Sequence, residues 1–573
     1  MKYILQLIKL SAVIGMGFTT VCCSEDDSPS RISPGENDTI VEILIAPSHP
    51  VFTQGKTRTL VANAIYSNGA VEDVTQRVQW TSDAQDVATV SNEAESKGRV
   101  YAKTAAVAKI SASIIGIVAS TSVNVTPAAV QHTEPLTVSD KNPRYFADTD
   151  GHIVYLTGSH FWRNFQDSGT IDPPPVFDFN AFLEFLDNHN HNFFRLWTWE
   201  QVKWATETTD DYWFDPLPYA RTGPGLGRDG KPKFDLQQFN QAYFDRMRSR
   251  VIEAGQHSMY VSVMLFNGWS IEDKNRGGGN PWPGHPYHRD NNINGIDGDP
   301  NGDNEGNEIH TLLIPEVTAL QEAYVRKVID TVNELNNVMY EISNESHGDS
   351  QDWQYHLTNY IKQYESSKPK QHPVGMTVEW RNGNNAELFA SPADWISPNG
   401  IGYTDNPTKA SGEKVILSDT DHLCGVCGDG GWVWKSFLRG INPVFMDVYD
   451  GNGVGVGEKD QDGNDPVWVD LRKQMGYTLD YARRINLESM EPNGTLVSTG
   501  YCLANTSETE YLVYLPKGGA VTIDLSGTKG KLAVEWFSTG TGNYVPVASI
   551  EGGSSRKLTA PFSGPAVLYL FQQ

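Results

Sequence analysis

Residues 337–346 read Asn-Val-Met-Tyr-Glu-Ile-Ser-Asn-Glu-Ser, a short apolar run of the kind that forms a β-strand. Successive side chains of a strand face opposite sides. Glu341, Ser343 and Glu345 would therefore share one face, and Asn344 would lie on the other. One acid in the middle of a strand and a second at its end suit a parallel barrel, because the active site forms where the barrel strands end.

This stretch resembles the acid/base strand of the clan-A retaining glycosidases, cellulase-like barrels in which an Asn-Glu pair closes the fourth strand. The resemblance implies that Glu345 is the proton donor. It also implies that Asn344 binds the 2-hydroxyl beside the scissile bond, a contact that strengthens in the transition state. The alternative interpretation is that Glu345 is an ordinary loop carboxylate.

Seven other short apolar runs alternate with helical stretches within residues 134–486, which is the pattern of a β/α repeat. They lie at residues 153–158, 192–197, 259–265, 373–379, 394–397, 414–419 and 442–447. Apolar residues at helical spacing predict helices that pack on the strands, for example at Phe239, Tyr243, Met247 and Val251. Eight strands predict a (β/α)8 TIM barrel over residues 134–486.

A β-sandwich is predicted on each side of the barrel. Residues 39–127 alternate apolar and polar positions between turns and resemble bacterial Ig-like (group 2) domains, for which we expect a spacer role. Residues 487–573 return to strands, such as Tyr-Leu-Val-Tyr-Leu at 511–515. They resemble the C-terminal sandwich that sequence families label collagen-binding and that follows apiosidase-like barrels. We expect a packing module there and do not extend collagen binding to this chain.

The N-terminus has the features of an export signal. Lys2 and Lys9 precede an apolar run at residues 10–21, which is too short to span a bilayer. Cys22, Cys23 and an acidic stretch follow, which resembles the signals of surface-exported Bacteroidetes lipoproteins and implies a lipid on Cys23. Cys22 as the lipidated residue and a cleaved signal without lipid are the alternatives. Residues 1–23 would be the signal and 24–38 a flexible tether, so we expect a protein anchored by its lipid to the outer membrane at the cell surface.

The composition limits the function classes. The 573 residues are 39% hydrophobic and 11% aromatic, as expected for a folded protein of several domains. A net charge of -25 argues against nucleic acid as a partner, because phosphate binding requires a basic surface. Cys424 and Cys427 are spaced as in a redox or zinc motif, but no second pair accompanies them. We therefore expect a local disulfide or two free thiols.

A two-carboxylate glycosidase needs a second acid, which we expect at the end of the seventh strand. There the sequence reads Ser-Asp-Thr-Asp-His at residues 418–422. Alignment with the cellulase-like strand places Asp419 on the nucleophile, where that family has glutamate. The shorter side chain leaves an inverting mechanism open, because inversion needs a wider separation. Asp421 is the second candidate and Glu379 the third. The alternative is that the Asp-Thr-Asp segment caps a loop or holds His422.

Other side chains at the strand ends suit a sugar site. The resemblance implies that Arg195 orients the nucleophile, and an arginine beside a carboxylate also keeps it ionised. His160 is expected to bind substrate hydroxyls, and Trp199 and Trp432 to stack on sugar rings. His422 and Glu379 complete the predicted substrate-binding residues.

Residues 297–308 match the twelve-residue pattern of a calcium-binding loop. The ligands would be Asp297, Asp299, Asn301, Asp303 and Glu308. The flanking helices of an EF-hand are missing from the sequence pattern, so a structural calcium site and an Asp/Gly-rich substrate loop are both open. We expect catalysis to require no cofactor, because two carboxyl groups suffice for glycoside hydrolysis.

These features predict an exported glycoside hydrolase that cleaves O-glycosidic bonds of a polysaccharide or oligosaccharide, with retention favoured. The alternative is a surface protein that binds glycans without cleaving them, which the missing glutamate on the seventh strand suggests. Adhesion to host matrix through the two β-domains is a third hypothesis. The oligomeric state is not indicated by the sequence.

Overall fold

The computed structural model describes residues 33–35, 37–127, 134–204, 212–274, 279–380, 383–449, 463–505, 507 and 509–572. The predicted signal with Cys23, and most of the predicted tether, lie outside these residues. Within the described residues, no helix has both the length and the apolar character needed to cross a membrane.

The N-terminal part is a β-sandwich around the buried indole of Trp80. Its sheets have the strand orders β1-β4-β5, β2-β10-β9-β6 and β3-β8-β7. The strands are β1 (Ile40–Ala46), β2 (Val51–Thr53), β3 (Thr57–Thr59), β4 (Val61–Tyr66), β5 (Val71–Asp73), β6 (Gln79–Ser82), β7 (Ala88–Val90), β8 (Arg99–Ala102), β9 (Ala106–Ile114) and β10 (Ile117–Thr126).

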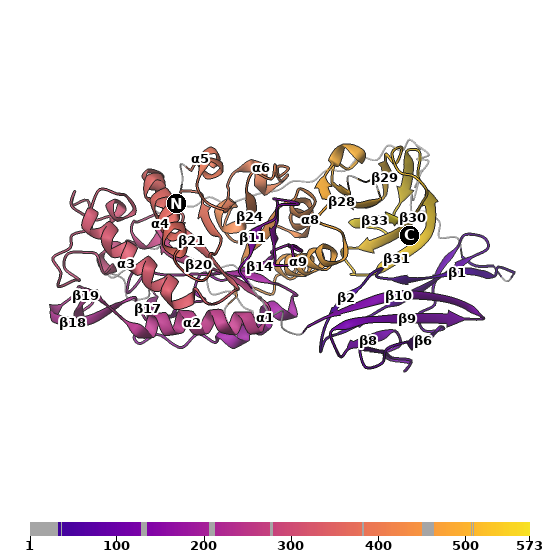
Figure 1. Cartoon of the computed structure of the whole chain (residues 1–573), viewed down its shortest axis with the longest axis horizontal. Coiled ribbons are helices and arrows are strands. Elements are labelled where there is room, and N and C mark those ends of the chain that lie inside the picture. The colour runs from indigo at the N-terminus through magenta and orange to yellow at the C-terminus, as the bar shows by residue number, and fades with distance from the viewer. Residues whose placement is uncertain are drawn as a thin grey trace, which may run out of the picture. The chain divides into compact units, whose positions relative to one another are not determined.

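The middle part is a nearly closed barrel of eight parallel strands (Figure 1). The first strand pairs with the last, since β14 hydrogen-bonds to β25. The fold class predicted from the sequence is confirmed. The strands, in spatial order, are β14 (Gly158–His160), β16 (Phe193–Leu196), β20 (Tyr260–Asn267), β21 (Val338–Asn344), β22 (Val374–Thr377), β23 (Trp395–Ser397), β24 (Val415–Asp419) and β25 (Asn442–Met446).

The first barrel strand lies later than predicted. Ile153 and Val154 form β13 (Ile153–Val154), which pairs antiparallel with β12 (Phe146–Ala147) outside the barrel; β11 (Thr137–Val138) completes that small sheet. The barrel strand begins at Gly158. A Cβ atom there would lie 2.1 Å from the carbonyl oxygen of Phe193, so glycine permits the close approach of β16.

Helices follow several of the strands, and polar side chains cap their first turns. The side chain of Asp178 accepts a hydrogen bond from Ala181 N at the start of α1, and Asn240 caps α2 in the same way. The predicted stripe on α2 is buried, although Phe239 ends the preceding strand. The helices are α1 (Phe179–Asn188), α2 (Gln241–Gln256), α3 (Pro315–Val332), α4 (Gln351–Glu365), α5 (Asn385–Ala390), α6 (Ile401–Thr404), α7 (Thr420–Leu423), α8 (Gly430–Leu438) and α9 (Pro466–Arg484).

Shorter elements decorate the loops. Two antiparallel pairs, β15 (Asp167–Gly169) with β17 (Trp213–Asp215) and β18 (Tyr219–Leu226) with β19 (Pro232–Phe239), lie near the second barrel strand in sequence. The 3-10 helices are η1 (Gly268–Ser270), η2 (Trp282–Gly284), η3 (Asn307–His310), η4 (Gly348–Ser350) and η5 (Gly494–Leu496).

The C-terminal part is a second β-structure around the buried Trp536. A six-stranded sheet has the order β26-β27-β28-β33-β30-β31, and β29 pairs with β32. The strands are β26 (Met490–Pro492), β27 (Cys502–Asn505), β28 (Glu510–Leu515), β29 (Ala520–Ile523), β30 (Lys531–Ser538), β31 (Tyr544–Glu551), β32 (Arg556–Thr559) and β33 (Ala566–Gln572).

The alternation predicted for residues 338–343 is present in β21. Tyr340 and Ile342 pack in the cluster between the barrel and its helices, whereas Met339 packs with strand residues inside the barrel. Glu341 points inward from the same face as Met339, where it meets Arg195 of β16. Inward-facing acids near the ends of parallel strands are therefore placed at one end of the barrel.

Candidate active site

Arg195 lies at the centre of a cluster of acids and is 2% exposed. Its Nε donates to Glu341 (2.9 Å), and its Nη1 donates to both Asp419 (3.0 Å) and Asp421 (3.1 Å). Its Nη2 donates to the amide oxygen of Asn344 (2.7 Å). Burial disfavours the charge of Arg195, but Glu341 and Asp419 outweigh burial and raise its pKa well above the usual value. The guanidinium thus holds both candidate nucleophiles.

Asp419 ends β24 and is almost fully enclosed. Its carboxylate lies 2.8 Å from Nε2 of His160, and its Oδ1 accepts the backbone N–H of Asp421 at 3.0 Å, which caps α7. Burial opposes ionisation, but His160 and Arg195 outweigh it and hold the pKa of Asp419 well below its usual range. Asp419 is therefore a fixed carboxylate that is fully engaged with the protein.

His160 does not face a substrate as predicted. Its side chain is completely buried, and its ring is stacked on Trp197 with 5.4 Å between the ring centroids. The physical reason is the adjacent Asp419, whose charge takes the hydrogen bond that we expected for a sugar hydroxyl. His160 supports the site from behind.

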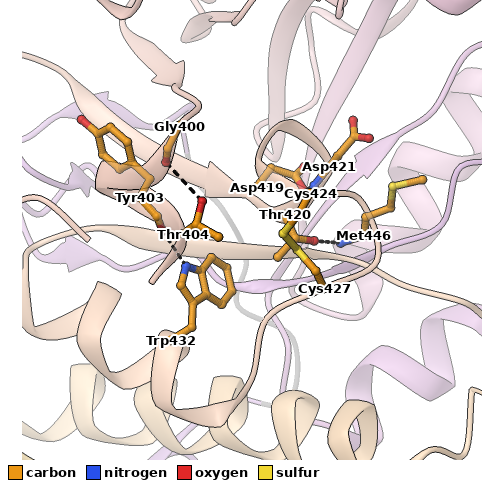
Figure 2. Close-up of a disulfide and its surroundings, with 10 residues drawn as sticks. All are labelled: Gly400, Tyr403, Thr404, Asp419, Thr420, Asp421, Cys424, Cys427, Trp432 and Met446. Atoms are coloured by element: carbon orange, nitrogen blue, oxygen red, sulfur yellow. Dashed lines mark hydrogen bonds between the residues drawn. A yellow bond between two sulfur atoms is a disulfide. The ribbon is translucent and has the colours of Figure 1, made fainter. Parts of the chain in front are cut away.

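Asp421 lies in the first turn of α7, beyond the end of the strand. Its side chain is 8% exposed, against 2% for Asp419. Burial raises the pKa of Asp421 to about 6; Arg195 opposes the rise and Asp419 adds to it. Figure 2 shows both acids at the start of this short helix, next to the disulfide.

Asn344 and His422 interact with each other. His422 Nε2 lies 3.0 Å from the amide oxygen of Asn344, and its Nδ1 lies 2.7 Å from Ser397 Oγ. Burial, with the charge of Arg195, lowers the pKa of His422 to about 3, so the ring is neutral. His422 is 6% exposed and supports Asn344, and its role as a substrate-binding residue stays a prediction.

Asn344 departs from simple strand alternation. We predicted it on the face opposite Glu341, yet both side chains bind Arg195. Asn344 is the last residue of β21, and the next residue, Glu345, adopts a positive φ of 45°. Among the described residues, no group accepts a hydrogen bond from the buried Nδ2 of Asn344. That N–H group fits the predicted contact with a substrate hydroxyl.

Glu345 directly follows β21 and is 4% exposed. Its Oε2 accepts a hydrogen bond from Trp269 Nε1 at 2.6 Å, and Lys274 Nζ donates to its backbone oxygen at 3.1 Å. Burial raises the pKa of Glu345 to about 8, and the negative charge of Asp421 adds to the rise. The side chain therefore stays protonated at neutral pH, as a general acid must.

A buried polar network holds the backbone behind Glu345. Ser346 Oγ lies 2.6 Å from Ser343 Oγ and 2.9 Å from His310 Nδ1, and the imidazole stacks on Trp353. Non-glycine residues at positive φ persist only where their surroundings hold them, and this network supplies such contacts. Sequence analysis assigned no role to His310, because it ends η3 and is far in sequence from the strand that it supports.

Glu200 continues this network. It accepts the backbone N–H of Asn267 at 2.8 Å and lies 3.4 Å from His285 Nε2 and 3.7 Å from His310 Nε2. Burial opposes its ionisation, but the neighbouring His285 and His310 lower the pKa of Glu200 to about 2. Sequence analysis missed Glu200, although it lies just after the second strand beside Trp199.

Glu379 lies just after β22 and is 1% exposed. Its carboxylate is buried, no described residue hydrogen-bonds to either oxygen, and it makes no hydrogen bond with Glu345, Asp419 or Asp421. Burial raises the pKa of Glu379 to about 7, and the charge of Glu387 on α5 contributes. The roles of Glu379 as third candidate nucleophile and as a substrate-binding residue stay predictions.

The two predicted sugar platforms are buried. Trp199 is 2% exposed, donates its N–H to the backbone of Trp162 and stacks on Phe214. Trp432 is 3% exposed and donates to the backbone oxygen of Tyr403, as Figure 2 shows. Indoles adjacent to a barrel core bury their large apolar faces, which corrects both predictions.

The calcium-like loop satisfies its own backbone. Asp299 accepts N–H groups from Gly302 (2.8 Å), Asp303 (3.2 Å) and Asn304 (2.9 Å). In the described parts of the chain, no three His, Cys, Asp or Glu side chains are grouped so that they could hold a metal ion. The predicted ligands Asp297, Asp299, Asn301, Asp303 and Glu308 thus do not gather around a centre, and calcium binding stays a prediction.

Cys424 and Cys427 form a disulfide directly after α7 (Figure 2). This confirms one of the two alternatives that we predicted for the pair. The backbone N–H of Cys424 donates to Thr420 O at 2.9 Å, and Thr420 Oγ1 accepts the N–H of Met446 at 2.9 Å. The short helix that carries Asp421 is therefore fixed on both sides.

Family models match three parts of the chain. Residues 41–122 match the bacterial Ig-like domain (group 2), and residues 492–566 match a model described as "Putative collagen-binding domain of a collagenase". Residues 202–382, which include Glu345, match a domain of unknown function, DUF6298. The first two matches agree with the resemblances seen in the sequence of the flanking domains.

Solved glycoside hydrolases have a similar fold. A structure titled as a putative glycoside hydrolase from Bacteroides vulgatus is 11% identical, covers 92% of this chain and 100% of its own, and has a TM-score of 0.51. A glycoside hydrolase family 5 structure from the same organism is 13% identical over 76% of this chain and 93% of its own, with a TM-score of 0.49. At these identities, the first similarity establishes the fold and nothing further.

A curated relative matches only a short segment. Ice-binding protein 1 of Shewanella frigidimarina is 34% identical over 91 residues, which are 16% of this chain. The match spans 10% of the length of that protein. Its function therefore does not extend to this chain.

Proposed function

We propose that this protein is a glycoside hydrolase that cleaves O-glycosidic bonds with retention, with Glu345 as acid/base and Asp421 as nucleophile. The observation that carries the proposal is the pair of carboxyl groups whose surroundings separate their pKa values. Glu345 has a pKa of about 8 and Asp421 one of about 6. Near neutral pH, one group keeps its proton while the other loses it, which is the division of roles that two-carboxylate hydrolysis requires.

Sequence alignment favours Asp419 as the nucleophile, but three features support Asp421. Asp421 is the more exposed of the two side chains. Its charge is the main electrostatic influence on Glu345 after burial. Both oxygens of Asp419 already accept hydrogen bonds from the protein, through His160, Arg195 and the start of α7. A nucleophile must approach the anomeric carbon, and Asp421 has fewer such contacts.

In the proposed cycle, Glu345 donates its proton to the leaving oxygen while the Asp421 carboxylate forms a bond to the anomeric carbon. The glycosidic C–O bond breaks, and the leaving group departs with the proton. Glu345, now ionised, takes a proton from water, whose oxygen then displaces Asp421 from the sugar. Arg195 positions Asp421, and the N–H group of Asn344 binds the neighbouring hydroxyl.

The leaving group separates the two roles experimentally. Glu345→Gln should lose turnover of substrates with poor leaving groups and keep reacting with activated aryl glycosides, which need no proton. Asp421→Asn should lose both. Equal loss on both substrates in Glu345→Gln would show that Glu345 is not the acid.

Product analysis tests the remaining elements. Proton NMR of the first product formed should show the substrate's own anomeric configuration, whereas the opposite anomer would show inversion. Chromatography after incubation with plant and host glycans should show released oligosaccharides. Binding without any released product would favour the glycan-binding alternative.

We also propose that Cys23 carries a lipid that anchors the protein to the outer membrane, facing outward. The support is the charged, apolar and acidic order of residues 1–27. Palmitate labelling of the full chain should be lost in Cys23→Ser and kept in Cys22→Ser. Labelling lost only in the Cys22 variant would assign the lipid to that residue, and no labelling would favour a cleaved signal.

A further inference from the structure

Five partly exposed aromatic side chains contact one another in a row, and we call this row the aromatic wall. Trp380 lies 5.3 Å from Trp269, Trp269 lies 6.2 Å from Trp204, and Trp204 lies 5.8 Å from Trp162, measured between ring centroids. Tyr212 extends the wall, at 5.9 Å from Trp162. Each of the five is intermediate between buried and exposed.

The wall lies at the carboxyl ends of the barrel strands. Trp162 follows β14, Trp204 follows β16, Trp269 lies in η1 directly after β20, and Trp380 follows β22. Loops at this end of a parallel barrel bind substrates, whereas the opposite end contributes stability. The positions of four of these rings thus follow from strand topology, and the wall belongs to the functional end.

Buried rings support the wall from behind. Trp199 packs against Trp204 at 4.7 Å and against Trp162 at 6.0 Å, and it stacks on Phe214 at 5.0 Å. Trp199 and Phe214 are nearly fully buried, so the exposed rings rest on a packed base. The wall is therefore held in one arrangement, which lowers the entropy cost of binding a ligand.

The wall reaches the candidate acid. Trp269 Nε1 donates to the carboxylate of Glu345 at 2.6 Å, so the same indole belongs to both features. Contiguous exposed apolar area on a soluble protein marks a binding site. Aromatic faces bind the C–H faces of sugar rings, and indole has the largest such face.

We propose that the aromatic wall binds a linear chain of pyranose units that extends from the bond cleaved at Glu345. This inference rests on the proposed function and narrows its substrate to oligosaccharides and polysaccharides with several sugar units on one side of the scissile bond. In this proposal a disaccharide contacts Trp269, whereas a longer chain also contacts Trp204 but not Trp162, because the guanidinium of Arg163 already lies over the Trp162 ring at 4.6 Å. Affinity therefore rises with chain length until the wall is covered.

Binding is measured by calorimetric titration on full-length Glu345→Gln, which cannot turn over natural glycans if the proposed function holds. The probes are disaccharides and hexasaccharides of the cello-, xylo-, manno- and galacturono- series. We expect at least one hexasaccharide to bind about tenfold tighter than its disaccharide. Failure of every hexasaccharide to bind, or equal affinity for both lengths, overturns the inference.

Trp204 provides the decisive variant, because it belongs to the wall but has no contact with Glu345 among the described residues. Trp204→Ala should weaken hexasaccharide binding about tenfold and leave disaccharide binding unchanged. Trp204→Phe, which retains a ring, should recover most of the loss. Trp468→Ala is the matched control, since Trp468 is also partly exposed but lies in α9 and stacks on Phe445. Equal effects of the two alanine variants overturn the inference.

The two proposals fail in different ways. Wall-dependent binding without hydrolysis of any substrate by the unmodified protein rejects the enzyme and retains the wall. Hydrolysis that Trp204→Ala leaves unchanged for long and short substrates rejects the wall and retains the enzyme.

Discussion

Replacing Glu345 by glutamine should make the protein more stable at alkaline pH than the unmodified chain. Glutamine keeps an oxygen that can accept the hydrogen bond from Trp269, and it cannot ionise. Burial raises the pKa of Glu345 from 4.5 to about 8, so the folded state binds this proton more tightly than the unfolded state does. Stability contributed by the protonated form is complete below pH 4.5 and is lost as the pH rises to about 8.

The size of this stability effect follows from the pKa shift of Glu345. One pKa unit corresponds to about 1.4 kcal/mol, so the cost of keeping Glu345 buried grows by on the order of 3 kcal/mol between about pH 5 and about pH 8. An amide buried in place of the carboxyl group costs about 1–3 kcal/mol if its N–H groups find no partner. That cost is the same at every pH. The pH dependence of the difference therefore isolates the carboxyl group.

Calorimetric unfolding of both proteins across this pH range measures the effect. The melting temperature of Glu345→Gln relative to the unmodified protein should rise by several degrees from the acidic to the alkaline end. Glu184→Gln is the control, since Glu184 is an exposed residue of α1 and its variant should show no such trend. A difference for Glu345→Gln that is constant with pH would refute the claim that a buried, protonated carboxyl group lies there.

Three further outcomes are expected. The profile of kcat/KM against pH should be bell-shaped, with its plateau between about pH 6 and about pH 8, because Asp421 must lose its proton and Glu345 must keep it. A kcat/KM that still rises above about pH 8 contradicts the assignment. Asp419→Asn should cost about 1–3 kcal/mol of stability in calorimetry, because it removes one charged partner of the buried Arg195 while Glu341 and Asp421 remain. A melting temperature equal to that of Asp421→Asn contradicts this. His310→Phe should lower kcat on the order of tenfold with little change in KM, because the variant loses the hydrogen bond to Ser346 that holds the backbone at Glu345. An unchanged kcat contradicts a positioning role for His310, and recovery of kcat in His310→Gln supports it.

The barrel could be predicted from the sequence because its signal is repeated. Eight apolar runs separated by helical stretches allow few other arrangements, and errors at single boundaries leave the count intact. The first strand shows such an error. Ile153 and Val154 are as apolar as a barrel strand, but their partners are in β12, and nothing local distinguishes an antiparallel partner from a parallel one.

From the sequence, the site could be predicted only for side chains that lie within strands. Glu341 and Arg195 lie within strands, and their meeting follows from alternation and strand order. Neither the positive φ of Glu345 nor the contact between Asn344 and Arg195 could be inferred from residue types. Whether a tryptophan is buried could not be inferred either, because loops far away in the sequence determine whether an indole at a strand end packs inward or outward.

Asp419 ends the seventh strand and Asp421 follows it, and a local change in backbone geometry gives these two acids different surroundings. Strand alternation ends at Asp419, whose backbone still has the extended values φ -96° and ψ 131° and whose side chain caps α7. Asp421 is therefore placed by a helical turn and not by the sheet, yet Arg195 Nη1 holds both carboxylates. The cellulase-like strand that this segment resembles ends in one glutamate, whereas this chain has a fixed charge followed by a second acid that is less enclosed. In the proposal, Asp419 keeps Arg195 in place. Asp421 places a carboxylate beyond the end of the strand, where the short side chain of Asp419 does not extend.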